Sequence, residues 1–223
     1  MGSQAFDIAS IYEDKPPGYF AGSRDDIVAL LKTGRDSAIL ELGCGTGATG
    51  CAALAAGKAG RYVGIELDQG AAEVAATVLT EVLCGDVQSL SLKGFEGSFD
   101  ALIVSEILEH LTDPWATLRS LATCIKPGGM IYASSPNISH RDIIAKLIAG
   151  RFDYTADGIM DRTHLRWFTP ASFHTLFEQA GITVTSIGPL VPLGRIARLL
   201  DAVTGGKFRH LFIPQIMISG FKA

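Results

Sequence analysis

Three alternating glycines directly follow a short apolar run early in the chain. Ala38–Leu42 is typical of a buried strand, and Gly43, Gly45 and Gly47 precede small residues at 48–56 that favour a helix. Glycine lacks a Cβ, so the backbone here can approach a ligand closely and adopt left-handed angles. The following helix N-terminus adds partial positive charge. In an open sheet such a loop lies at the carboxyl end of a strand, so the segment predicts an α/β fold with a ligand site.

Strands and helices alternate from about residue 25 to residue 135, which predicts a doubly wound parallel sheet covered on both faces. The apolar runs predict strands at 38–42, 62–66, 81–84, 99–105 and 130–134, then 182–187 and 212–221. Helical patterns are expected at 25–31, 48–56, 70–77, from Asp113-Pro114 to a stop at Lys126–Gly129, at 141–149 and from Thr169-Pro170 to Gly181.

Length, charge and cysteine content limit the classes of protein to which this chain can belong. The chain has 223 residues, 48% of them hydrophobic, which suits one α/β domain over residues 1–223. A net charge of −4 indicates no nucleic-acid partner. No apolar stretch reaches membrane-spanning length, and residues 1–10 lack the basic region followed by an apolar run that marks a signal peptide. We therefore expect a cytoplasmic protein without stable membrane insertion. The four cysteines form no Cys-x-x-Cys pair, which predicts reduced, mostly buried thiols and no metal site.

Two ligands compete for the glycine loop. Residues 45–50 also spell the dinucleotide pattern G-x-G-x-x-G, and Glu66 at the end of the second strand suits ribose hydroxyls with either ligand. Glu41, just before the loop, would repel a pyrophosphate but would attract an ammonium or a sulfonium. S-adenosylmethionine (SAM) carries both cations and no phosphate. Asp86, after the third strand, can accept from an adenine amino group. These features favour SAM over a nicotinamide dinucleotide.

Over residues 36–135 the sequence resembles the class I SAM-dependent methyltransferases. The motifs are Glu41-Leu-Gly-Cys-Gly-Thr-Gly47, Gly64-Ile-Glu66, Gly85-Asp86-Val87, Phe99-Asp100, Leu108-Glu-His-Leu111 and Lys126-Pro-Gly-Gly129. The resemblance implies a Rossmann-like seven-stranded sheet whose last strand is antiparallel, and a reaction that yields S-adenosylhomocysteine. It implies cofactor contacts from Glu41, Gly43, Cys44, Gly45, Gly47, Glu66, Leu67, Asp86, Val87, Ser105 and Glu106.

The rest of the chain is expected to handle the acceptor. Ser135-Pro-Asn137, His140 and Gly158 to Thr169 resemble a bacterial subgroup often associated with surface-glycan functions. We expect residues 136–168 and 190–210 to form a cap over the acceptor. Residues 1–24 are expected to form an N-terminal lid in which Tyr12, Tyr19 and Arg24 contact the cofactor. The alternative for residues 1–24 is a strap that only covers apolar surface. The candidate substrate-binding residues are His140, Asp161, Arg166 and Trp167. A salt-bridged turn remains the alternative for the 161–168 cluster.

We predict methyl transfer to a small-molecule acceptor, more readily to oxygen than to nitrogen or carbon, on a sugar-like or other polar metabolite. His164 and His110 are candidate catalytic bases, needed only if the acceptor must lose a proton. A monomer or homodimer is expected. A SAM-binding accessory protein without catalysis and an NAD-linked oxidoreductase remain the alternatives. Residues 190–210 predict an amphipathic helix that is either part of the cap or a dimer contact, or a membrane-surface helix.

Overall fold

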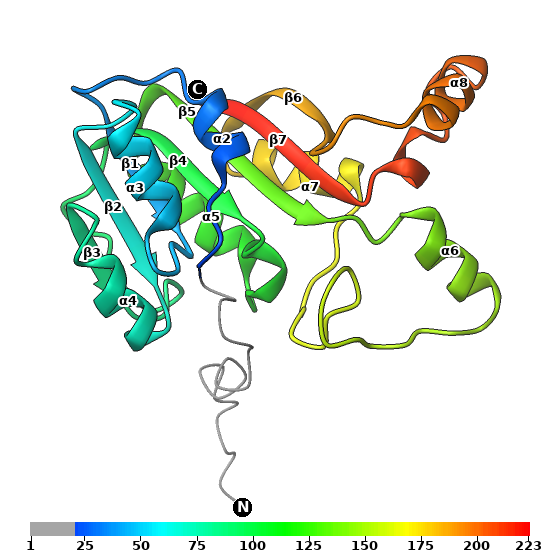
Figure 1. Cartoon of the computed structure of the whole chain (residues 1–223), viewed down its shortest axis with the longest axis horizontal. Helices are drawn as coiled ribbons and strands as arrows, with labels where there is room; N and C mark the ends of the chain where they lie inside the picture. The colour runs from blue at the N-terminus through cyan, green and yellow to red at the C-terminus, as the bar shows by residue number, and fades with distance from the viewer. Residues whose placement is uncertain (1–20) are drawn as a thin grey trace, which may run out of the picture. The chain divides into compact units, whose positions relative to one another are not determined.

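The computed structural model describes residues 21–223, with the backbone alone for Ile196. Among these residues a seven-stranded sheet runs in the order β3-β2-β1-β4-β5-β7-β6 (Figure 1). The strands are β1 (Ala38–Leu42), β2 (Arg61–Glu66), β3 (Glu81–Cys84), β4 (Phe99–Ser105), β5 (Ile125–Pro136), β6 (Ile182–Pro189) and β7 (Gln215–Lys222). β7 is antiparallel to both of its neighbours, β5 and β6. The expected seven-stranded α/β sheet with an antiparallel last strand is confirmed.

The helices are α2 (Asp25–Leu30), α3 (Ala48–Ala55), α4 (Gln69–Ala75), α5 (Pro114–Thr123), α6 (Arg141–Ile148), α7 (Pro170–Gln179) and α8 (Arg195–Val203), with the 3₁₀ turns η2 (Leu108–His110) and η3 (Arg209–Phe212). The described chain forms two compact units. The first runs to Ser91 and includes Phe99–Ala101, and the second comprises Leu92–Ser98 and Leu102–Ala223. No helix within residues 21–223 has the length and apolar character to cross a membrane.

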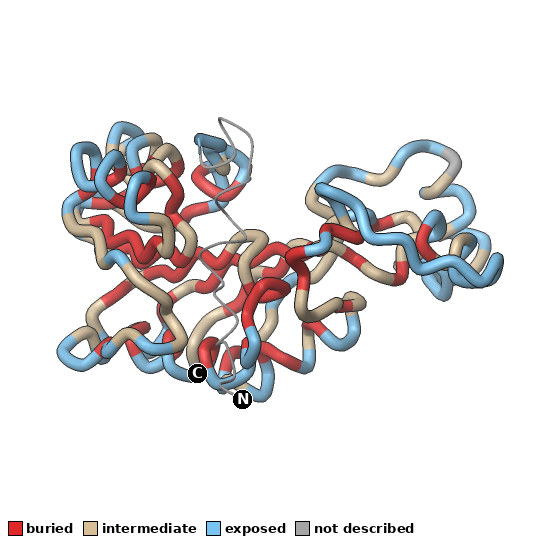
Figure 2. The backbone as a smooth tube through the Cα atoms, turned by 90° about the horizontal axis from the view of Figure 1, so that it is seen from below, coloured by how far each residue is buried: buried red, intermediate tan, exposed pale blue. Residues whose placement is uncertain are grey.

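The first unit is built on parallel strands that are buried on both sides. β1 pairs with β2 in register from Ala38 opposite Arg61 to Leu42 opposite Ile65, and β2 pairs in parallel with β3. Burial of nearly every residue in β1 and β2 explains their continuous apolar runs (Figure 2). Gly64 in β2 is needed for close packing, because a Cβ there would lie 2.4 Å from Cys44 Sγ. This contact places the loop after β1 directly against β2.

The second unit combines antiparallel pairing with helix packing. β5 pairs with β7 from Met130 opposite Phe221 to Pro136 opposite Gln215. α7 begins with a capping box, in which the side chains of Thr169 and Ser172 each accept from the other residue's backbone N–H. As the sequence indicated, α7 buries an apolar face of Phe173, Leu176 and Phe177.

Two predicted boundaries are wrong. Lys126–Gly129 was expected to end a helix ahead of a strand, but α5 already ends at Thr123 and these four residues lie within β5. Ile125 is completely buried, so hydrophobic burial brings the chain into the sheet before the glycines. The last strand begins at 215 rather than 212, because residues 209–212 form η3 and Pro214 has no N–H for a ladder bond.

Candidate functional site

The glycine loop of the first unit has the backbone that its sequence predicts. Gly43, Gly45 and Gly47 have φ angles of 72°, 52° and 84°, in the left-handed region that side chains disfavour. Gly43 N–H donates to Ile65 O at 2.8 Å, which joins the loop to β2. Gly47 is the N-cap residue of α3, and a Cβ there would meet Val78 Cγ2 at 2.9 Å. The loop therefore leads from the end of β1 to a helix N-terminus, where backbone N–H groups can face a ligand.

Glu66 holds this loop in place. Its carboxylate is 6% exposed and accepts from Gly45 N–H at 2.8 Å and from Asp68 N–H at 2.9 Å, each through a different oxygen. Burial raises the pKa of Glu66, although these backbone hydrogen bonds oppose the shift. Since each carboxylate oxygen has two lone pairs, Glu66 can position the loop and still accept from a diol. Sequence reasoning missed this positioning role.

Glu41 lies in β1, two residues before Gly43 of the loop. Only 3% of this residue is exposed, and Tyr62 Oη donates to its carboxylate at 2.9 Å. Burial raises the pKa of Glu41 from 4.5 to about 7, while the Tyr62 hydrogen bond and the charge of Arg24 lower it in part. The Arg24 guanidinium pairs with Asp26 at 2.8 Å. The structure therefore places Arg24 and Glu41 in one electrostatic neighbourhood; Tyr12 and Tyr19 lie outside the described residues.

The other first-unit candidates lie at the ends of β2 and β3. Asp86 accepts from Gln88 N–H at 2.9 Å and so begins a turn after β3. Gly85 precedes it with a φ of 143°. Leu67 and Val87 are half-buried, and Cys44 is buried. Of the four cysteines, which all have free thiols, Cys51 and Cys84 are exposed, so the expectation of mostly buried thiols is met by only half of them.

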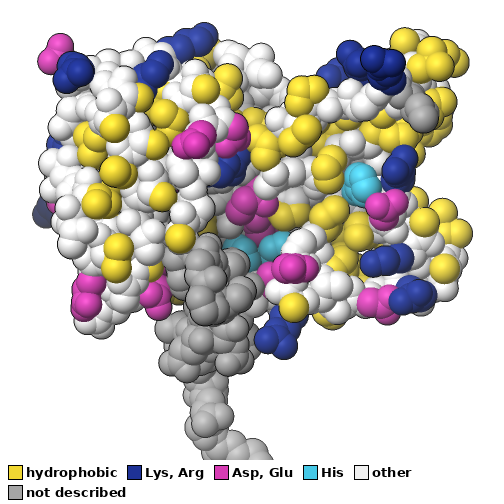
Figure 3. Space-filling model, viewed as in Figure 1, with side chains coloured by type: hydrophobic (Ala, Val, Ile, Leu, Met, Phe, Trp, Pro, Cys, Tyr) yellow, Lys and Arg dark blue, Asp and Glu magenta, His cyan; other side chains and the backbone are white. Residues whose placement is uncertain are grey.

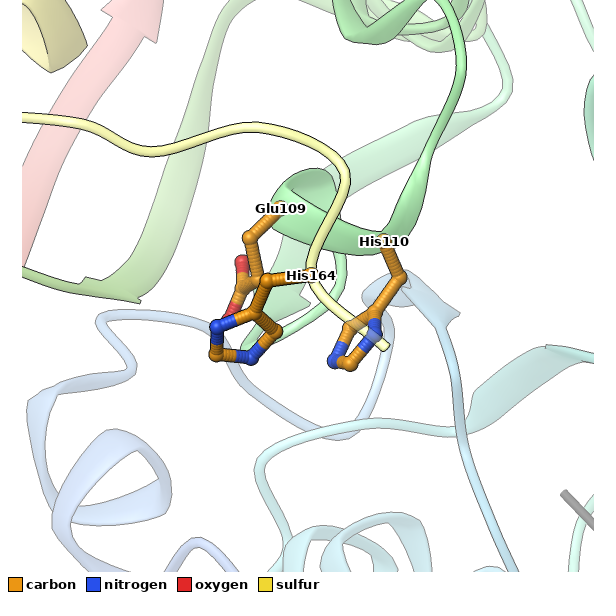
Figure 4. A group of neighbouring side chains, drawn as sticks. All are labelled: Glu109, His110 and His164. Atoms are coloured by element: carbon orange, nitrogen blue, oxygen red, sulfur yellow. The ribbon is translucent and has the colours of Figure 1, made fainter. Parts of the chain in front are cut away.

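In the second unit, three buried side chains converge from two segments far apart in sequence. Glu109 and His110 come from η2, and His164 comes from the loop before α7 (Figure 4). Their ligand atoms lie within 4.8 Å of one another, and the two imidazole ring centroids are 4.7 Å apart. We call these three residues the Glu-His cluster. Backbone N–H groups of Leu165 and Arg166 donate to Glu109 O at 2.8 and 2.9 Å, which ties the two segments together.

Each cluster member has a polar partner that orients it. His110 Nδ1 lies 3.3 Å from Thr163 O, and His164 Nδ1 lies 3.2 Å from Ile159 O. A carbonyl oxygen only accepts, and Thr163 Oγ1, which lies 3.2 Å from His110 Nδ1, already donates to Asp161. Both rings therefore carry a proton on Nδ1 and a lone pair on Nε2. Ser135 Oγ donates to Glu109 Oε2 at 3.1 Å.

Glu109 sits in an unfavourable environment for a lone negative charge. It is 1% exposed, and its Oε1 is buried with no hydrogen-bond partner within the described part of the chain. Burial raises the pKa of Glu109 well above its usual range, and the neighbouring charge of Glu106 raises it further. An ionised carboxylate here needs a nearby cation or proton donor.

Ser105 and Glu106, expected beside the cofactor, lie at the end of β4. Ser105 Oγ is 3.0 Å from Ser134 Oγ, and Glu106 N–H donates to Ser134 O at 3.0 Å. Glu106 has a φ of 55°, which a side chain rarely adopts. Such strain is concentrated at functional positions in proteins.

The predicted substrate-binding residues fall into two groups. Asp161 accepts from both Thr163 N–H and Thr163 Oγ1 at 2.8 Å, and its carbonyl oxygen accepts from His164 N–H at 3.0 Å. Arg166 donates to the carbonyls of Leu165 and Thr112. His140 instead caps α6 by accepting from Asp142 N–H at 3.4 Å, and burial lowers its pKa. The structure therefore brings Asp161 beside His110 and His164 and gives His140 a separate capping role.

Trp167 belongs to an aromatic group that the sequence did not suggest. Its ring centroid lies 5.7 Å from that of Phe152 and 6.2 Å from that of Tyr154. Phe152 and Tyr154 are 45% and 56% exposed, so this group presents aromatic surface. Sequence reasoning also missed Glu109, although the pair Glu109-His110 between Leu108 and Leu111 was a usable signal.

Comparisons with known proteins agree with this geometry. A methyltransferase-domain family model matches residues 19–187. The ubiquinone biosynthesis O-methyltransferase of Chromobacterium violaceum is 27% identical over 173 residues, which are 73% of this chain and 72% of that protein.

Solved structures with the same fold include a SAM-dependent methyltransferase from Archaeoglobus fulgidus. It has a TM-score of 0.64 and 19% identity, over 92% of this chain and 97% of that one. Another is the methyltransferase in a complex with the Haloferax volcanii Trm112 methyltransferase activator, with a TM-score of 0.66 and 17% identity, over 96% of this chain and 97% of that one. The family match decides between SAM and a nicotinamide dinucleotide in favour of SAM, and between catalysis and a purely accessory role in favour of catalysis. The chain belongs to the class I SAM-dependent methyltransferases, and its cofactor is SAM.

Proposed function

We propose that the enzyme transfers the methyl group of SAM to a hydroxyl oxygen of a small molecule. The observation that carries this proposal is the buried Glu-His cluster, which supplies groups able to promote loss of a hydroxyl proton. The name of the Chromobacterium violaceum relative, an O-methyltransferase, supports oxygen over nitrogen or carbon as the acceptor atom. We infer a cytoplasmic enzyme that acts on small molecules and not on nucleic acid.

The reaction is a direct displacement. A lone pair of the acceptor oxygen forms a bond to the methyl carbon while the bond from that carbon to the sulfonium sulfur breaks. The electron pair stays on sulfur, which yields S-adenosylhomocysteine, and the hydroxyl proton, whose loss the Glu-His cluster promotes, passes to water. Alignment of oxygen, carbon and sulfur supplies most of the catalysis, because the sulfonium is already a good leaving group.

For the cofactor we propose a division of roles among the first-unit residues. The loop at Gly43–Gly47, which includes Cys44, flanks the methionine part of SAM, Glu66 accepts from the ribose hydroxyls, and Asp86 accepts from the adenine amino group. Leu67 and Val87 pack on the adenine ring. Glu41 and Arg24 provide charge for the amino and carboxylate groups. Tyr12 and Tyr19 complete the proposed set, because their aromatic rings would attract the positively charged sulfonium.

Two acceptor classes fit the second unit. The exposed faces of Phe152 and Tyr154 beside Trp167 suit an acceptor with a ring that packs on an aromatic face, as sugar and phenol rings do. Arg166 and His140 add polar groups that suit a sugar-like or other polar metabolite. The name of the relatives favours a precursor of ubiquinone as the second candidate.

A transfer assay with methyl-labelled SAM tests the proposal over separate pools of sugar nucleotides, phenols and carboxylates. We expect label in a methyl ether of a sugar or phenol. Tyr154→Ala should raise KM for that acceptor and leave the dissociation constant of SAM unchanged, with Phe95→Ala, at a distance in sequence from the aromatic group, as the control. Label recovered only on nitrogen, carbon or carboxylate would contradict the proposal.

A further inference from the structure

The Glu-His cluster contains the donor atoms of a catalytic metal site. Two imidazoles and one carboxylate are the protein ligands of several catalytic zinc and non-haem iron centres. In this chain the three groups are buried, and their ligand atoms lie within 4.8 Å of one another. Figure 4 shows both rings and the carboxylate directed to the same region from η2 and from the loop that carries His164. Three protein ligands leave coordination positions for a substrate oxygen.

The hydrogen bonds around the cluster are a second, independent observation. Metal-binding histidines usually donate their other ring N–H to a carbonyl or carboxylate, which orients the ring and fixes the tautomer. His110 and His164 both contact a backbone carbonyl through Nδ1, at 3.3 and 3.2 Å. This arrangement presents the Nε2 lone pairs as the ligand atoms.

The Glu109 carboxylate is likewise oriented by a hydrogen bond through one of its atoms, which leaves another atom for a ligand. Ser135 Oγ holds Glu109 Oε2 at 3.1 Å, and the other oxygen, Oε1, is buried without a hydrogen-bond partner in residues 21–223. An unsatisfied carboxylate oxygen beside two imidazoles is the expected state of a ligand whose partner is a cation. A purely structural turn would gain from pairing that oxygen with an N–H group.

We propose that Glu109, His110 and His164 bind one divalent transition-metal ion, such as Zn²⁺ or Mn²⁺, and that this ion coordinates the acceptor hydroxyl. The second half of the proposal rests on the proposed function, whereas the binding site itself does not. Mg²⁺ is disfavoured because it prefers oxygen ligands over imidazole.

The ion would activate the acceptor as a Lewis acid. A bound cation lowers the pKa of a coordinated hydroxyl, so its proton leaves to water before or during attack on the methyl carbon. It also fixes the position of the attacking oxygen. Neither effect involves oxidation or reduction, so the methyl transfer remains balanced as written above.

Titration calorimetry of the chelator-treated full chain with ZnCl₂ tests the site without SAM or acceptor. We expect saturable binding of one ion per chain and, with CoCl₂, visible absorption bands from nitrogen and oxygen ligation. His164→Ala and Glu109→Gln should each weaken zinc binding by more than about 100-fold, beyond the loss typical of outer partners. His174→Ala is the matched control, because His174 is half-buried on α7 and pairs with Glu178 outside the cluster.

Two results would overturn the proposal: no saturable binding of Zn²⁺, Mn²⁺ or Co²⁺ by the wild-type chain, or equal binding by wild type and both ligand variants. The wild-type titration decides even if the variants fail to fold. Glu66→Ala separates metal binding from cofactor binding, because this variant should lose affinity for SAM and keep its affinity for zinc. Zinc binding without methyl transfer to any hydroxyl would leave the site intact and refute the proposed function. Transfer that persists in a chain shown not to bind metal would indicate that the histidines act directly as bases.

Discussion

Glu41 is a buried carboxyl group whose protonation makes stability depend on pH. Its pKa is raised from 4.5 to about 7. Between these values the folded chain keeps a proton that the unfolded chain has released, so the free energy of unfolding falls as pH rises from 4.5 to 7. The loss is roughly 3 kcal/mol, at 1.36 kcal/mol for each pKa unit. Glu41→Gln should remove this loss in urea unfolding at pH 5 and pH 8, whereas the exposed Glu73→Gln should not. Parallel pH profiles for wild type and Glu41→Gln would rule the effect out.

Glu66 combines loop positioning with proposed cofactor binding. Glu66→Ala should weaken SAM binding by about 10- to 100-fold, because hydrogen bonds to a charged group contribute about 1.5–3 kcal/mol. The variant also removes the acceptor for Gly45 N–H, so the loss should show as a higher dissociation constant in calorimetry. Glu81→Gln, on the adjacent strand and paired with Arg61, provides the control. Unchanged affinity in a folded Glu66→Ala chain would remove Glu66 from the site.

At the level of elements, the packing of β2 against the glycine loop depends on one missing Cβ. Gly64→Ala would place a carbon 2.4 Å from Cys44 Sγ. We expect a destabilisation of about 1–3 kcal/mol, as for other overpacked cores. The double variant Gly64→Ala with Cys44→Ala should recover part of that loss, which urea unfolding of the double-mutant cycle measures. Gly34→Ala is the control, because nothing lies within 4 Å of its added Cβ. Strict additivity would mean that the clash is relieved elsewhere.

At the scale of the whole molecule, α8 carries exposed apolar side chains that either a membrane surface or another part of the protein could cover. Leu199, Leu200 and Val203 are 65%, 42% and 76% exposed, and Figure 3 shows hydrophobic and basic side chains together over this part of the chain. The net charge is −4, and Arg209 lies 3.9 Å from Asp201. A single short helix without a second anchor binds membranes only marginally. We therefore predict that the chain stays in solution with anionic vesicles in a flotation assay.

Leu199→Asp distinguishes the two hypotheses for α8, namely a cap or dimer contact and a membrane-surface helix. If the helix is part of the cap or a dimer contact, this variant should reduce turnover or dimer formation and leave flotation unchanged at background. If the wild-type chain floats with the vesicles and Leu199→Asp abolishes this flotation, then α8 is a membrane-surface helix and our prediction is wrong.

The sequence by itself determined those features that depend on neighbouring residues. The Gly43–Gly47 loop, the alternation of strands and helices, and the Thr169 cap of α7 are local patterns, because backbone angles and capping hydrogen bonds involve residues a few positions apart. The family resemblance predicted the antiparallel last strand, which the sheet confirms. Motif spacing likewise placed Glu66 at the carboxyl end of β2, beside the loop that it holds.

Only the tertiary structure decided which polar side chains meet. His110 and His164 were separate candidates for one role, and Glu109 had no assigned role, until the contacts of Leu165 and Arg166 with Glu109 O brought their segments together. Tertiary burial of Ile125 likewise extended β5 across Lys126–Gly129, against the local helix-stop signal. The physical reason is that burial and convergence depend on long-range packing, which a local pattern of residues does not encode.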